Sequence, residues 1–495
     1  MANFQSASNR FLAWFKDCGG VFRDDLLEVR DLRSKDAGRG IIAKQDIPED
    51  TTLFTIPRNI IISIQTSDLA EKLPGIFEQP VDADDDNEDD DNEDDQDHEP
   101  EALDSWGSLI LVMLYEYLQG EASRWKTYLD ILPQAFETPI FWTPDELKEL
   151  EGTSLTTEKI GKKESDRMLR ERILPIVTSH PDVFSPPGAP RLNEDDLLSL
   201  AHRMGSTIMA YAFDLENEEE QSEDEEDGWI EDRDGKSLIG MVPMADMLNA
   251  NAEFNAHVHH GDQLQVTSLR ESIPAGSEIL NYYGPLPSSE LLRRYGYVTS
   301  EHHRYDVAEI SWSLVRTALA EELKLSEDTI ADIEVGIFLL PASTGRNGDV
   351  ERKLESELEE FFVIERDAGE PSSYGTLTQP PVLREISTEL EEQTKAFLKA
   401  LKKRDPKRKR SETICDTVLE KALRTRLGQY PTSAKQDESL LSKEGLSKRH
   451  RMAVEVRLGE KRLLQEALAL VQAGKNTVRE HEEEGRVGKK AKRAS

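Results

Sequence analysis

The sequence predicts an α+β fold in which a β-rich domain is interrupted by a helical insert and followed by an all-α region. Three observations support this prediction. Strand-and-turn segments fill residues 26–63 and 238–284, a stretch with helical spacing separates these two blocks, and helical periodicity returns after residue 300. With 495 residues the chain is too long for one compact core, so two or three domains are expected.

The first β block is divided by turn residues. A strand is expected over 26–32, and Gly38 and Gly40 make the tight turn that follows it. Residues 41–43 begin the next strand, and residues 47–50 turn that strand back. We expect this block to form one part of a sheet.

The insert has helical periodicity. Residues 105–133 and 193–214 carry apolar side chains three and four positions apart. Between these stretches, Thr143 is placed as an N-cap, Pro144 as the first helical residue, and Glu146 as the side chain that closes a capping box. The insert is therefore expected over about 103–235, inside a β-rich domain that spans 20–300.

β character returns at residues 238–248, 256–273 and 277–284. From about residue 301 to residue 474 the pattern is mainly helical, and it is clearest over 437–472. We expect an all-α C-terminal domain over 301–474 and a charged tail over 475–495.

The formal charge of −37 comes largely from two acidic runs. Residues 82–101 hold 14 acidic side chains and residues 214–227 hold 10, with no Lys or Arg in either run. Without these 24 charges the rest of the chain carries −13. Such runs cannot bury apolar area, so we expect acidic loops that either keep the protein soluble or attract basic partners.

Other features of the composition exclude several classes of protein. No run of 18 apolar residues is present, and the N-terminus lacks the layout of a signal peptide. The two cysteines, Cys18 and Cys415, exclude a disulfide framework and a cysteine-built zinc site, which favours an intracellular protein. Basic clusters at 402–410 and 489–493 are typical of nuclear import, and equally of solvated helix ends.

Taken one at a time, the short motifs are weak evidence. The Gly-x-Gly at 38–40 comes before a strand rather than after one, which argues against a dinucleotide site. Asp246, Asn249 and Asn255 are expected to cap turns. The histidines at 257, 259 and 260 have no cysteine or acidic motif beside them, so no metal site is expected.

The order and spacing of the fragments are more specific. The fragments are "AGRGIIAKQDIPE" from residue 37, "SRWKTYLDILP" from 123, "MAYAFD" from 209, "VPMADMLNANAEFN" from 242, "SIPAGSEILNYYG" from 272 and "LLRRYGYV" from 291. Together they resemble the SET-domain protein-lysine methyltransferases, in the branch related to Rubisco large-subunit methyltransferase. "YPTSAKQDESLL" and "AVEVRLGEKRLL" resemble the substrate-binding domain of that branch. The resemblance covers about residues 11–471 and implies a split SET domain followed by a helical substrate-binding domain.

Members of this family transfer a methyl group from S-adenosyl-L-methionine to a lysine amine. The transfer needs alignment and a neutral amine, and deprotonating a lysine at pH 7 costs about 4.6 kcal/mol. An aromatic channel lowers this cost because it disfavours the charged form. The resemblance implies that Tyr283 is the catalytic hydroxyl, which also touches the cofactor, and that the neighbouring Tyr282 contacts substrate.

The resemblance also implies the other site residues. Gly38, Arg39 and Gly40 correspond to the loop along the methionine end of the cofactor, and further cofactor contacts are Tyr211, Asn249, Ala250 and Tyr295. Histidine is usual in the family where this chain has Ala250, which puts cofactor affinity in question more than activity. The positions implied to face substrate are Trp125, Ala212 and Asp214, and no metal is implied.

We therefore expect a nuclear, S-adenosylmethionine-dependent protein-lysine methyltransferase that monomethylates a basic protein of the large ribosomal subunit. A histone or another nuclear basic protein is the alternative substrate. A non-catalytic acidic escort of basic proteins is an alternative of a different class, but an escort has no need of Tyr283. Neither a nucleic acid nor a membrane is expected as a direct partner.

Overall fold

The computed structural model describes residues 2–35, 37–77, 103–186, 192–215, 238–338, 358–406 and 414–491. The acidic run 82–101 lies outside the described residues, as does the run 214–227 from residue 216 onward. The basic clusters also lie partly outside them, at 407–410 and 492–493. Among the described helices, none combines the length and apolar content that crossing a bilayer requires.

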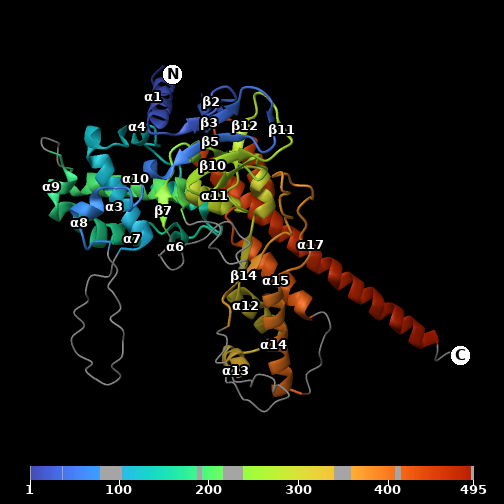
Figure 1. The fold of residues 1–495 in the computed structure, drawn as a ribbon. Coiled ribbons are helices and arrows are strands. Elements are labelled where there is room, and N and C mark those ends of the chain that lie inside the picture. Colours follow the sequence, from blue (N-terminus) through green and yellow to red (C-terminus); the bar gives the residue numbers. More distant parts are fainter. Residues whose placement is uncertain are drawn as a thin grey trace, which may run out of the picture.

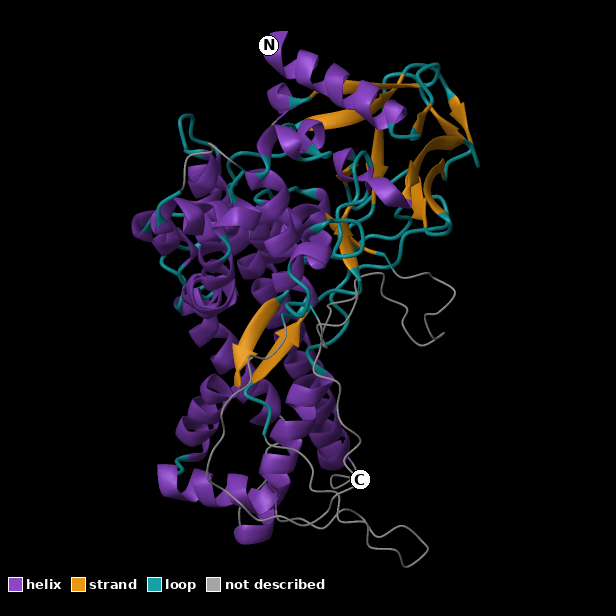
Figure 2. Cartoon of the chain, turned by 60° about the vertical axis from the view of Figure 1, so that its left-hand side comes forward, coloured by secondary structure: helices purple, strands orange, loops and turns teal. Residues whose placement is uncertain are grey.

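The molecule has three parts (Figure 1). Most of the strands gather on one side of the upper part, and the helices of the insert lie beside them. The C-terminal helices extend below, and the last helix, α17, runs from the middle of the molecule out to the C-terminus. Colouring by secondary structure separates the β-rich part from the insert in the same way (Figure 2).

Two four-stranded sheets form the β-rich domain. One has the order β1-β5-β10-β9, made of Val21–Phe22, Thr52–Pro57, Gln263–Ser268 and Ala256–His259. The other has the order β2-β3-β12-β8, made of Leu27–Asp31, Arg39–Ala43, Glu278–Asn281 and Asn249–Ala250. Each sheet joins two strands from before the insert to two from after it, which confirms the interrupted β domain that the sequence predicts.

Two shorter ladders also lie in the described part of this domain. β4 (Ile47–Pro48) pairs with β11 (Ser272–Ile273), and β6 (Ala212–Asp214) pairs with β7 (Ile239–Met241). Both pairs are antiparallel, whereas β12 and β8 run parallel to each other. The parallel pair brings residue 249 beside Leu280, next to the turn that carries the two adjacent tyrosines.

The insert is built on two long helices, α3 (Ser105–Leu118) and α10 (Glu194–Tyr211). Asp104 caps α3 through the amide of Gly107, and Asn193 caps α10 through the amide of Asp196. The predicted capping box of Thr143 and Glu146 is present at α5. The remaining α-helices of the insert are α4 (Lys126–Leu129), α5 (Pro144–Leu147), α6 (Thr157–Ile160), α7 (Lys162–Met168), α8 (Leu174–Ser179) and α9 (Pro181–Phe184).

The N-terminal helix α1 (Ala2–Asp17) belongs to the same core. Its Phe11 and Phe15 are fully buried in the main hydrophobic cluster, which also contains residues of the sheets and of the insert. Apolar burial of this kind is the principal stabilising contribution in a domain core. The insert and the strands therefore share one core.

The C-terminal region is helical, as predicted, with one addition. Its helices are α12 (Trp312–Leu323), α13 (Glu327–Phe338), α14 (Thr388–Arg404), α15 (Ile414–Gly428), α16 (Ala434–Leu441) and α17 (Lys448–Ala491). A two-stranded antiparallel ladder of β13 (Ala308–Ser311) and β14 (Phe361–Ile364) stands among them, so the region is not purely α-helical. The helix α17 also continues to Ala491, whereas the sequence predicted its end near residue 474.

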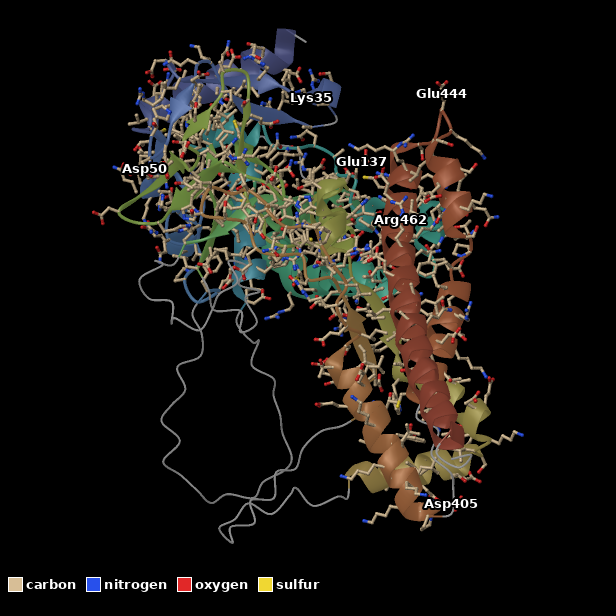
Figure 3. All side chains as sticks on the ribbon, turned by 90° about the vertical axis from the view of Figure 1, so that its right-hand side faces the viewer. Lys35, Asp50, Glu137, Asp405, Glu444 and Arg462 are labelled. Carbon is tan, nitrogen blue, oxygen red and sulfur yellow. The ribbon has the colours of Figure 1, made fainter. Side chains whose placement is uncertain are left out.

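Helix α17 joins the C-terminal region to the insert through buried polar contacts. Glu460 accepts hydrogen bonds from the amide and the hydroxyl of Ser154, at 2.8 Å and 2.7 Å, and one from the Tyr430 hydroxyl at 2.6 Å. Closer to the surface, Glu137 of the insert, which is labelled in Figure 3, forms an ion pair of 2.6 Å with Arg449 of α17. Because a buried carboxylate is stable only when its hydrogen bonds are satisfied, the contacts of Glu460 define how the two parts meet.

Candidate active site

Three tyrosines meet where the β-rich domain ends. Tyr283 follows β12, Tyr295 is the last residue of α11 (Ser288–Tyr295), and Tyr297 comes two residues later. The rings of Tyr283 and Tyr295 are stacked, with centroids 4.8 Å apart and an interplanar angle of 20°. The centroid of Tyr297 lies 6.1 Å from that of Tyr295. The "NYYG" and "RRYGYV" segments therefore build one aromatic cluster.

Two glycines with left-handed backbone set this arrangement. Gly284 has φ +88° and turns the chain immediately after Tyr283. Gly296 has φ +75° and ends α11, and a Cβ there would lie 3.0 Å from the Glu137 carbonyl carbon and the Thr138 nitrogen. Glycine is the residue that adopts this conformation without strain.

The Tyr283 hydroxyl is held by the backbone. It donates a hydrogen bond of 3.0 Å to the carbonyl of Leu248, the residue before β8. Since β8 lies alongside β12, the sheet itself brings these two groups together. The hydroxyl proton is used in this bond, and a phenol oxygen that donates can also accept a hydrogen bond.

The phenols of the cluster remain neutral. Burial raises the pKa of Tyr283 well above its ordinary value, and burial likewise raises the pKa of Tyr295 and of Tyr297. A phenol of this kind does not serve as a base near neutral pH, so Tyr283 acts through its hydrogen bonds. The same low-polarity surroundings disfavour a charged ammonium group.

A buried carboxyl, which the sequence analysis treated only as a turn residue, lies near the cluster. Asp246 accepts a hydrogen bond of 2.7 Å from the Tyr128 hydroxyl, and its other carboxyl oxygen is buried without a partner among the described residues. Burial raises the pKa of Asp246 to about 7. Burial, and to a smaller extent the charge of the Asp246 carboxyl, raises the pKa of Tyr211, the last residue of α10, to about 12.

The glycines of the Gly-Arg-Gly turn have different surroundings. A Cβ on Gly38 would meet no heavy atom within 4 Å, so the chain there borders open space. A Cβ on Gly40 would lie 2.3 Å from Leu32 Cδ1 and 2.6 Å from the Glu278 carboxylate. Gly40 therefore allows the sheet to pack, and Gly38 leaves room for a ligand beside the backbone.

Asn249 connects this turn to β12. Its side-chain amide donates to the Arg39 carbonyl at 3.1 Å and to the Glu278 carboxylate at 2.6 Å. The backbone N–H of Asn251 donates a hydrogen bond of 3.2 Å to the Asn281 backbone carbonyl. The segment that the sequence assigned to cofactor binding is thus hydrogen-bonded to the strand that ends at the tyrosine pair.

The side chain of Arg39 has a structural role. Its guanidinium donates to the Ser8 hydroxyl at 2.9 Å and to the Ile131 carbonyl at 2.8 Å, and it lies 3.9 Å from the centroid of the Phe4 ring. These contacts tie the Gly-Arg-Gly turn to α1 and to the end of α4. Any contact of this turn with a cofactor is therefore left to the backbone.

The described residues offer groups that fit a bound S-adenosylmethionine. The buried hydroxyl of Tyr297 and the buried side-chain oxygen of Asn251 have no hydrogen-bond partner among them. Buried polar atoms are normally paired, so these two indicate a polar ligand. Asn251 directly follows Ala250 in the chain, and the backbone at Gly38 borders open space.

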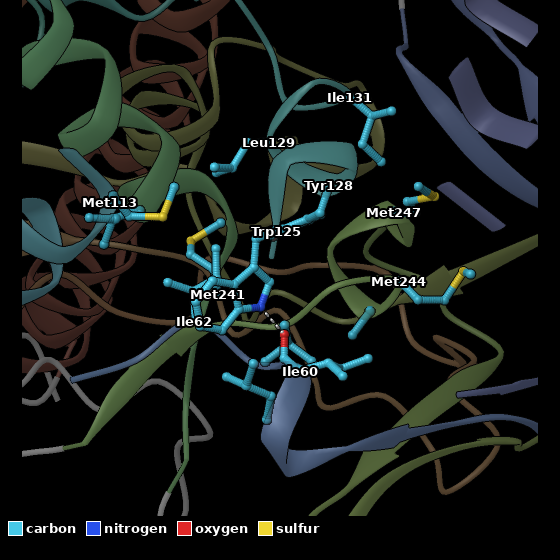
Figure 4. Close-up of a cluster of buried hydrophobic side chains, with 14 of the residues drawn as sticks. Ile60, Ile62, Met113, Trp125, Tyr128, Leu129, Ile131, Met241, Met244 and Met247 are labelled. Carbon is cyan, nitrogen blue, oxygen red and sulfur yellow. Dashed lines mark hydrogen bonds between the residues drawn. The ribbon is translucent and has the colours of Figure 1, made fainter. Parts of the chain in front are cut away.

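The structure corrects the prediction for Trp125. Its side chain is only 2% exposed and lies in the main core, and its indole nitrogen donates to the Ile60 carbonyl at 2.7 Å (Figure 4). A side chain enclosed in this way cannot face a substrate. Trp125 is a core residue, and the indole binds the backbone because a buried N–H needs an acceptor.

The other residues implied to face substrate are Tyr282, Ala212 and Asp214. The Tyr282 ring stacks on Phe254, with centroids 4.7 Å apart, since neighbouring residues of an extended segment point to opposite sides. Ala212 and Asp214 lie in β6, directly after Tyr211. Their contacts with substrate stay predictions, and Tyr282 would have to make its contact from the other side of the turn.

The histidines near residue 259 belong to the sheet. The rings of His257 and His259 lie edge to face with centroids 4.5 Å apart, and His259 Nε2 lies 2.8 Å from the Thr267 hydroxyl. Within the described part of the chain, no group of three or more His, Cys, Asp or Glu side chains has the arrangement of a metal site.

We expect Asn249→Ala to weaken cofactor binding about tenfold, because the Gly-Arg-Gly turn and β12 lose the amide that joins them. Ala250→His is expected to change affinity by no more than about threefold, because the backbone groups stay in place. Titration calorimetry with S-adenosylmethionine measures both. A loss of measurable binding in Ala250→His would show that this pocket is shaped differently from the pocket of the family.

Asp246→Asn is expected to change how stability depends on pH. In the folded protein the Asp246 carboxyl keeps its proton up to about pH 7. The stabilising contribution of the protonated carboxyl is complete at pH values below the pKa that the group has in the unfolded chain. It is lost as the pH rises through the pKa that the group has in the folded protein. The parent should therefore lose up to about 4 kcal/mol relative to the variant between about pH 4 and pH 7. Urea denaturation of both proteins at several pH values measures the difference, and parallel curves would contradict the prediction.

Comparison with known proteins gives matches over most of the chain. Residues 38–284 match the SET domain, and residues 379–464 match the Rubisco LSMT substrate-binding domain. Ribosomal lysine N-methyltransferase 4 of Saccharomyces cerevisiae is 32% identical over 336 residues, which span 66% of this chain and 63% of that protein. N-lysine methyltransferase SETD6 of Homo sapiens is 28% identical over 460 residues, 88% of this chain and 84% of that protein.

The fold also matches a solved structure. The crystal structure of the SET domain of LSMT bound to lysine and AdoHcy superposes with a TM-score of 0.60 at 20% identity, covering 95% of this chain and 92% of that one. The two domain matches occur in the order that the fold shows, with the split β-rich domain first and the C-terminal helices after it. The chain therefore belongs to the SET-domain protein-lysine methyltransferases that carry a Rubisco LSMT substrate-binding domain.

Proposed function

We propose that this S-adenosylmethionine-dependent protein-lysine methyltransferase acts on a basic protein of the large ribosomal subunit and adds one methyl group. The observation that carries the proposed chemistry is the stacked pair of Tyr283 and Tyr295, with the Tyr283 hydroxyl bound to the Leu248 carbonyl. The ribosomal substrate is supported by the yeast relative, which is a ribosomal lysine N-methyltransferase.

The residues of the cluster prepare the lysine amine. S-adenosylmethionine, when bound, supplies a methyl group that is attached to a sulfonium sulfur. The sulfur leaves as a neutral thioether when the methyl group is transferred. The Tyr283 oxygen accepts one N–H of the neutral amine, which fixes the direction of the nitrogen lone pair. The neutral phenols around it favour the amine over the ammonium form.

The proposal of a single methyl transfer is supported by how the amine would be held. Tyr283 would orient the nitrogen by accepting an N–H, and a monomethylated amine has one N–H for this bond where the unmethylated amine has two. Rotation of a methylated amine into a reactive position would also bring its methyl group against the stacked rings. A monomethylated product should therefore be a poor substrate for a second transfer.

A nuclear location is part of the proposal. It is supported by the basic clusters at 402–410 and 489–493, which are of the nuclear-import type. Fluorescence imaging of the tagged full chain, compared with a variant in which the lysines and arginines of both clusters are replaced by glutamine, measures it. Cytoplasmic signal from the unaltered chain would contradict the location.

A competition assay tests the substrate. Proteins of purified large ribosomal subunits and core histones are mixed in equal mass with the enzyme and labelled cofactor. We expect most of the label in one ribosomal protein. Label mainly in histones would favour the alternative substrate, and stable binding of basic proteins without transfer would favour the acidic escort.

Activity is expected to survive strong chelators, because methyl transfer from a sulfonium requires no metal and the described residues provide no ligand cluster. The measurement is the methylation rate before and after dialysis against EDTA, with metal analysis of the protein. Loss of activity that zinc restores would show that a metal site had been missed.

A further inference from the structure

We propose that the free edge of strand β14 in the C-terminal region binds an extended basic segment of the protein substrate as an added strand. The inference rests on the proposed function, in which the substrate is a basic protein. It assigns a recognition surface away from the tyrosine cluster, on the strand pair that the sequence did not predict.

The backbone of β14 has hydrogen-bonding groups that point away from its partner. Trp312 donates to the carbonyl of the residue directly opposite, Glu360, at 2.7 Å, so these two residues form a hydrogen-bonded pair. In an antiparallel ladder such pairs alternate with pairs whose N–H and C=O groups point outward. The register places Phe361 and Val363 in outward-pointing pairs.

These outward groups are available. No described residue makes a hydrogen bond to the main-chain N–H or C=O of Phe361 or Val363. An edge strand with unpaired backbone groups is a template for pairing with another extended chain. Peptide recognition by strand addition uses an edge of this kind.

A cavity of about 530 Å³ lies along this edge. It is lined on one side by the consecutive residues 361–363 and on the other by residues 384, 385 and 387–389. Side chains of consecutive strand residues point to opposite faces, so a cavity that touches all three borders the edge of the strand. Its volume is within the range of known ligand sites, roughly 300–1,000 Å³.

The cavity is a slot with two closed ends. At one end, Asp367 and Val382 exchange two backbone hydrogen bonds of 3.0 Å. At the other end, the side chain of Gln393 exchanges two bonds of 3.1 Å with the backbone of Glu359. Between these two points the facing segments, which the structure describes throughout, exchange no backbone hydrogen bond, and the cavity lies between them.

The rim of the slot is acidic. Glu359, Glu365, Glu385 and Glu389 are exposed and make no ion pair with the described cations. The two arginines in the lining are already engaged, since Arg384 binds Asp367 at 2.6 Å and Arg366 binds Glu466 at 2.8 Å. The remaining charge is negative, so a chain rich in lysine or arginine complements it.

The outer face of β14 is apolar. The side chains of Phe361 and Val363 are 61% and 45% exposed. An added strand places alternate side chains on this face. The preferred occupant is therefore an extended segment in which basic residues alternate with apolar ones.

The strand pair stands at the junction of the C-terminal helices with the rest of the molecule (Figure 2). Glu309 in β13 forms an ion pair with Lys159 of the insert, and its carbonyl accepts from Arg426 at 2.8 Å. A segment bound at β14 is therefore held on an element that is fixed to the catalytic part, and this raises the local concentration of the substrate.

Binding of a defined probe tests the inference without relying on methyl transfer. The probe is a fluorescein-labelled peptide of alternating lysine and valine, and the measurement is fluorescence anisotropy with the full chain. Val363→Pro removes one outward N–H and keeps the ladder bonds to β13, a substitution that edge strands tolerate. We expect it to weaken binding at least about tenfold, while Val363→Ala stays within about threefold.

A second variant tests the same surface in case the proline variant does not fold. Glu365→Gln combined with Glu385→Gln alters only exposed side chains and should weaken the probe about fivefold or more at low salt, with a flatter salt dependence. The same peptide with glutamate in place of lysine should not bind. Unchanged affinity in both the proline and the glutamine variants would overturn the inference.

Two further results separate this inference from the proposed function. Methylation of a basic protein by Val363→Pro with unchanged KM would leave the enzyme assignment intact and reject the β14 surface. Probe binding that depends on Val363 without any methylation would reject only the proposed function. If the probe binds only after residues 339–357 are deleted, that segment of the chain is the occupant and the inference is wrong.

Discussion

Tyr283→Phe is expected to lower the rate of methyl transfer at least tenfold, about 1.4 kcal/mol of barrier. The substitution keeps the ring that stacks on Tyr295 and removes the hydroxyl that binds the Leu248 carbonyl. The amine then loses the acceptor that orients its lone pair. Cofactor affinity should change little, because the aromatic surface remains.

Steady-state kinetics and calorimetry on the same protein samples measure the two effects. Tyr117→Phe is the matched control, because the Tyr117 side chain is 36% exposed on α3 and belongs to no part of the cluster. The control should keep full activity. Unaltered turnover in Tyr283→Phe would remove this tyrosine from the catalytic role.

Gly375→Ala is expected to give the largest loss of stability among the substitutions considered. Gly375 has φ +67°, and a Cβ there would lie 2.3 Å from the Phe254 carbonyl oxygen. The backbone of Phe254 donates to the Gly375 carbonyl at 3.0 Å, so the new methyl group must break the contact between the two segments. Phe254 also stacks on Tyr282, and the change should therefore raise the KM for a protein substrate.

Gly369→Ala separates backbone strain from the steric clash. Gly369 has nearly the same backbone angle, φ +65°, but a Cβ there would lie 3.7 Å from its nearest neighbour, Gln379 Cβ. Its substitution should cost about 1–2 kcal/mol from the left-handed conformation alone. Gly375→Ala should cost at least about 2 kcal/mol more. Equal shifts of the urea midpoint in the two variants would show that Phe254 moves aside freely.

The sequence predicted the parts of the structure whose signals are local or ordered along the chain. The capping box at Thr143 and the strand that begins near Ile41 follow from turn and cap residues within a few positions. The tyrosines at 283 and 295 were selected through their motifs, and their stacking follows from two glycine turns, at Gly284 and Gly296.

The parts that were missed depend on contacts between distant residues. Asp246 was interpreted as a turn residue, and its partner Tyr128 is 118 positions away. Trp125 was assigned to substrate, but tertiary packing buries it in the main core, where its indole binds the Ile60 carbonyl. The strand at Phe361–Ile364 pairs with residues 308–311, and an isolated apolar run of four residues does not distinguish a strand from a buried helix.

The end of α17 was missed for a different reason. Residues 475–491 are rich in charged side chains, which the sequence analysis assigned to a tail. Glutamate, lysine and arginine are also good helix formers, so the helix continues through them. Composition alone does not separate a charged tail from a charged helix.

The most direct test of the central claim is mass spectrometry of a ribosomal-protein extract after incubation with the enzyme and S-adenosylmethionine. The proposed mechanism predicts one large-subunit protein that carries a single methyl group on one lysine, and much less of this product with Tyr283→Phe. Methylation of the same lysine at an equal rate by Tyr283→Phe, or no methylated lysine in any protein of the extract, would contradict it.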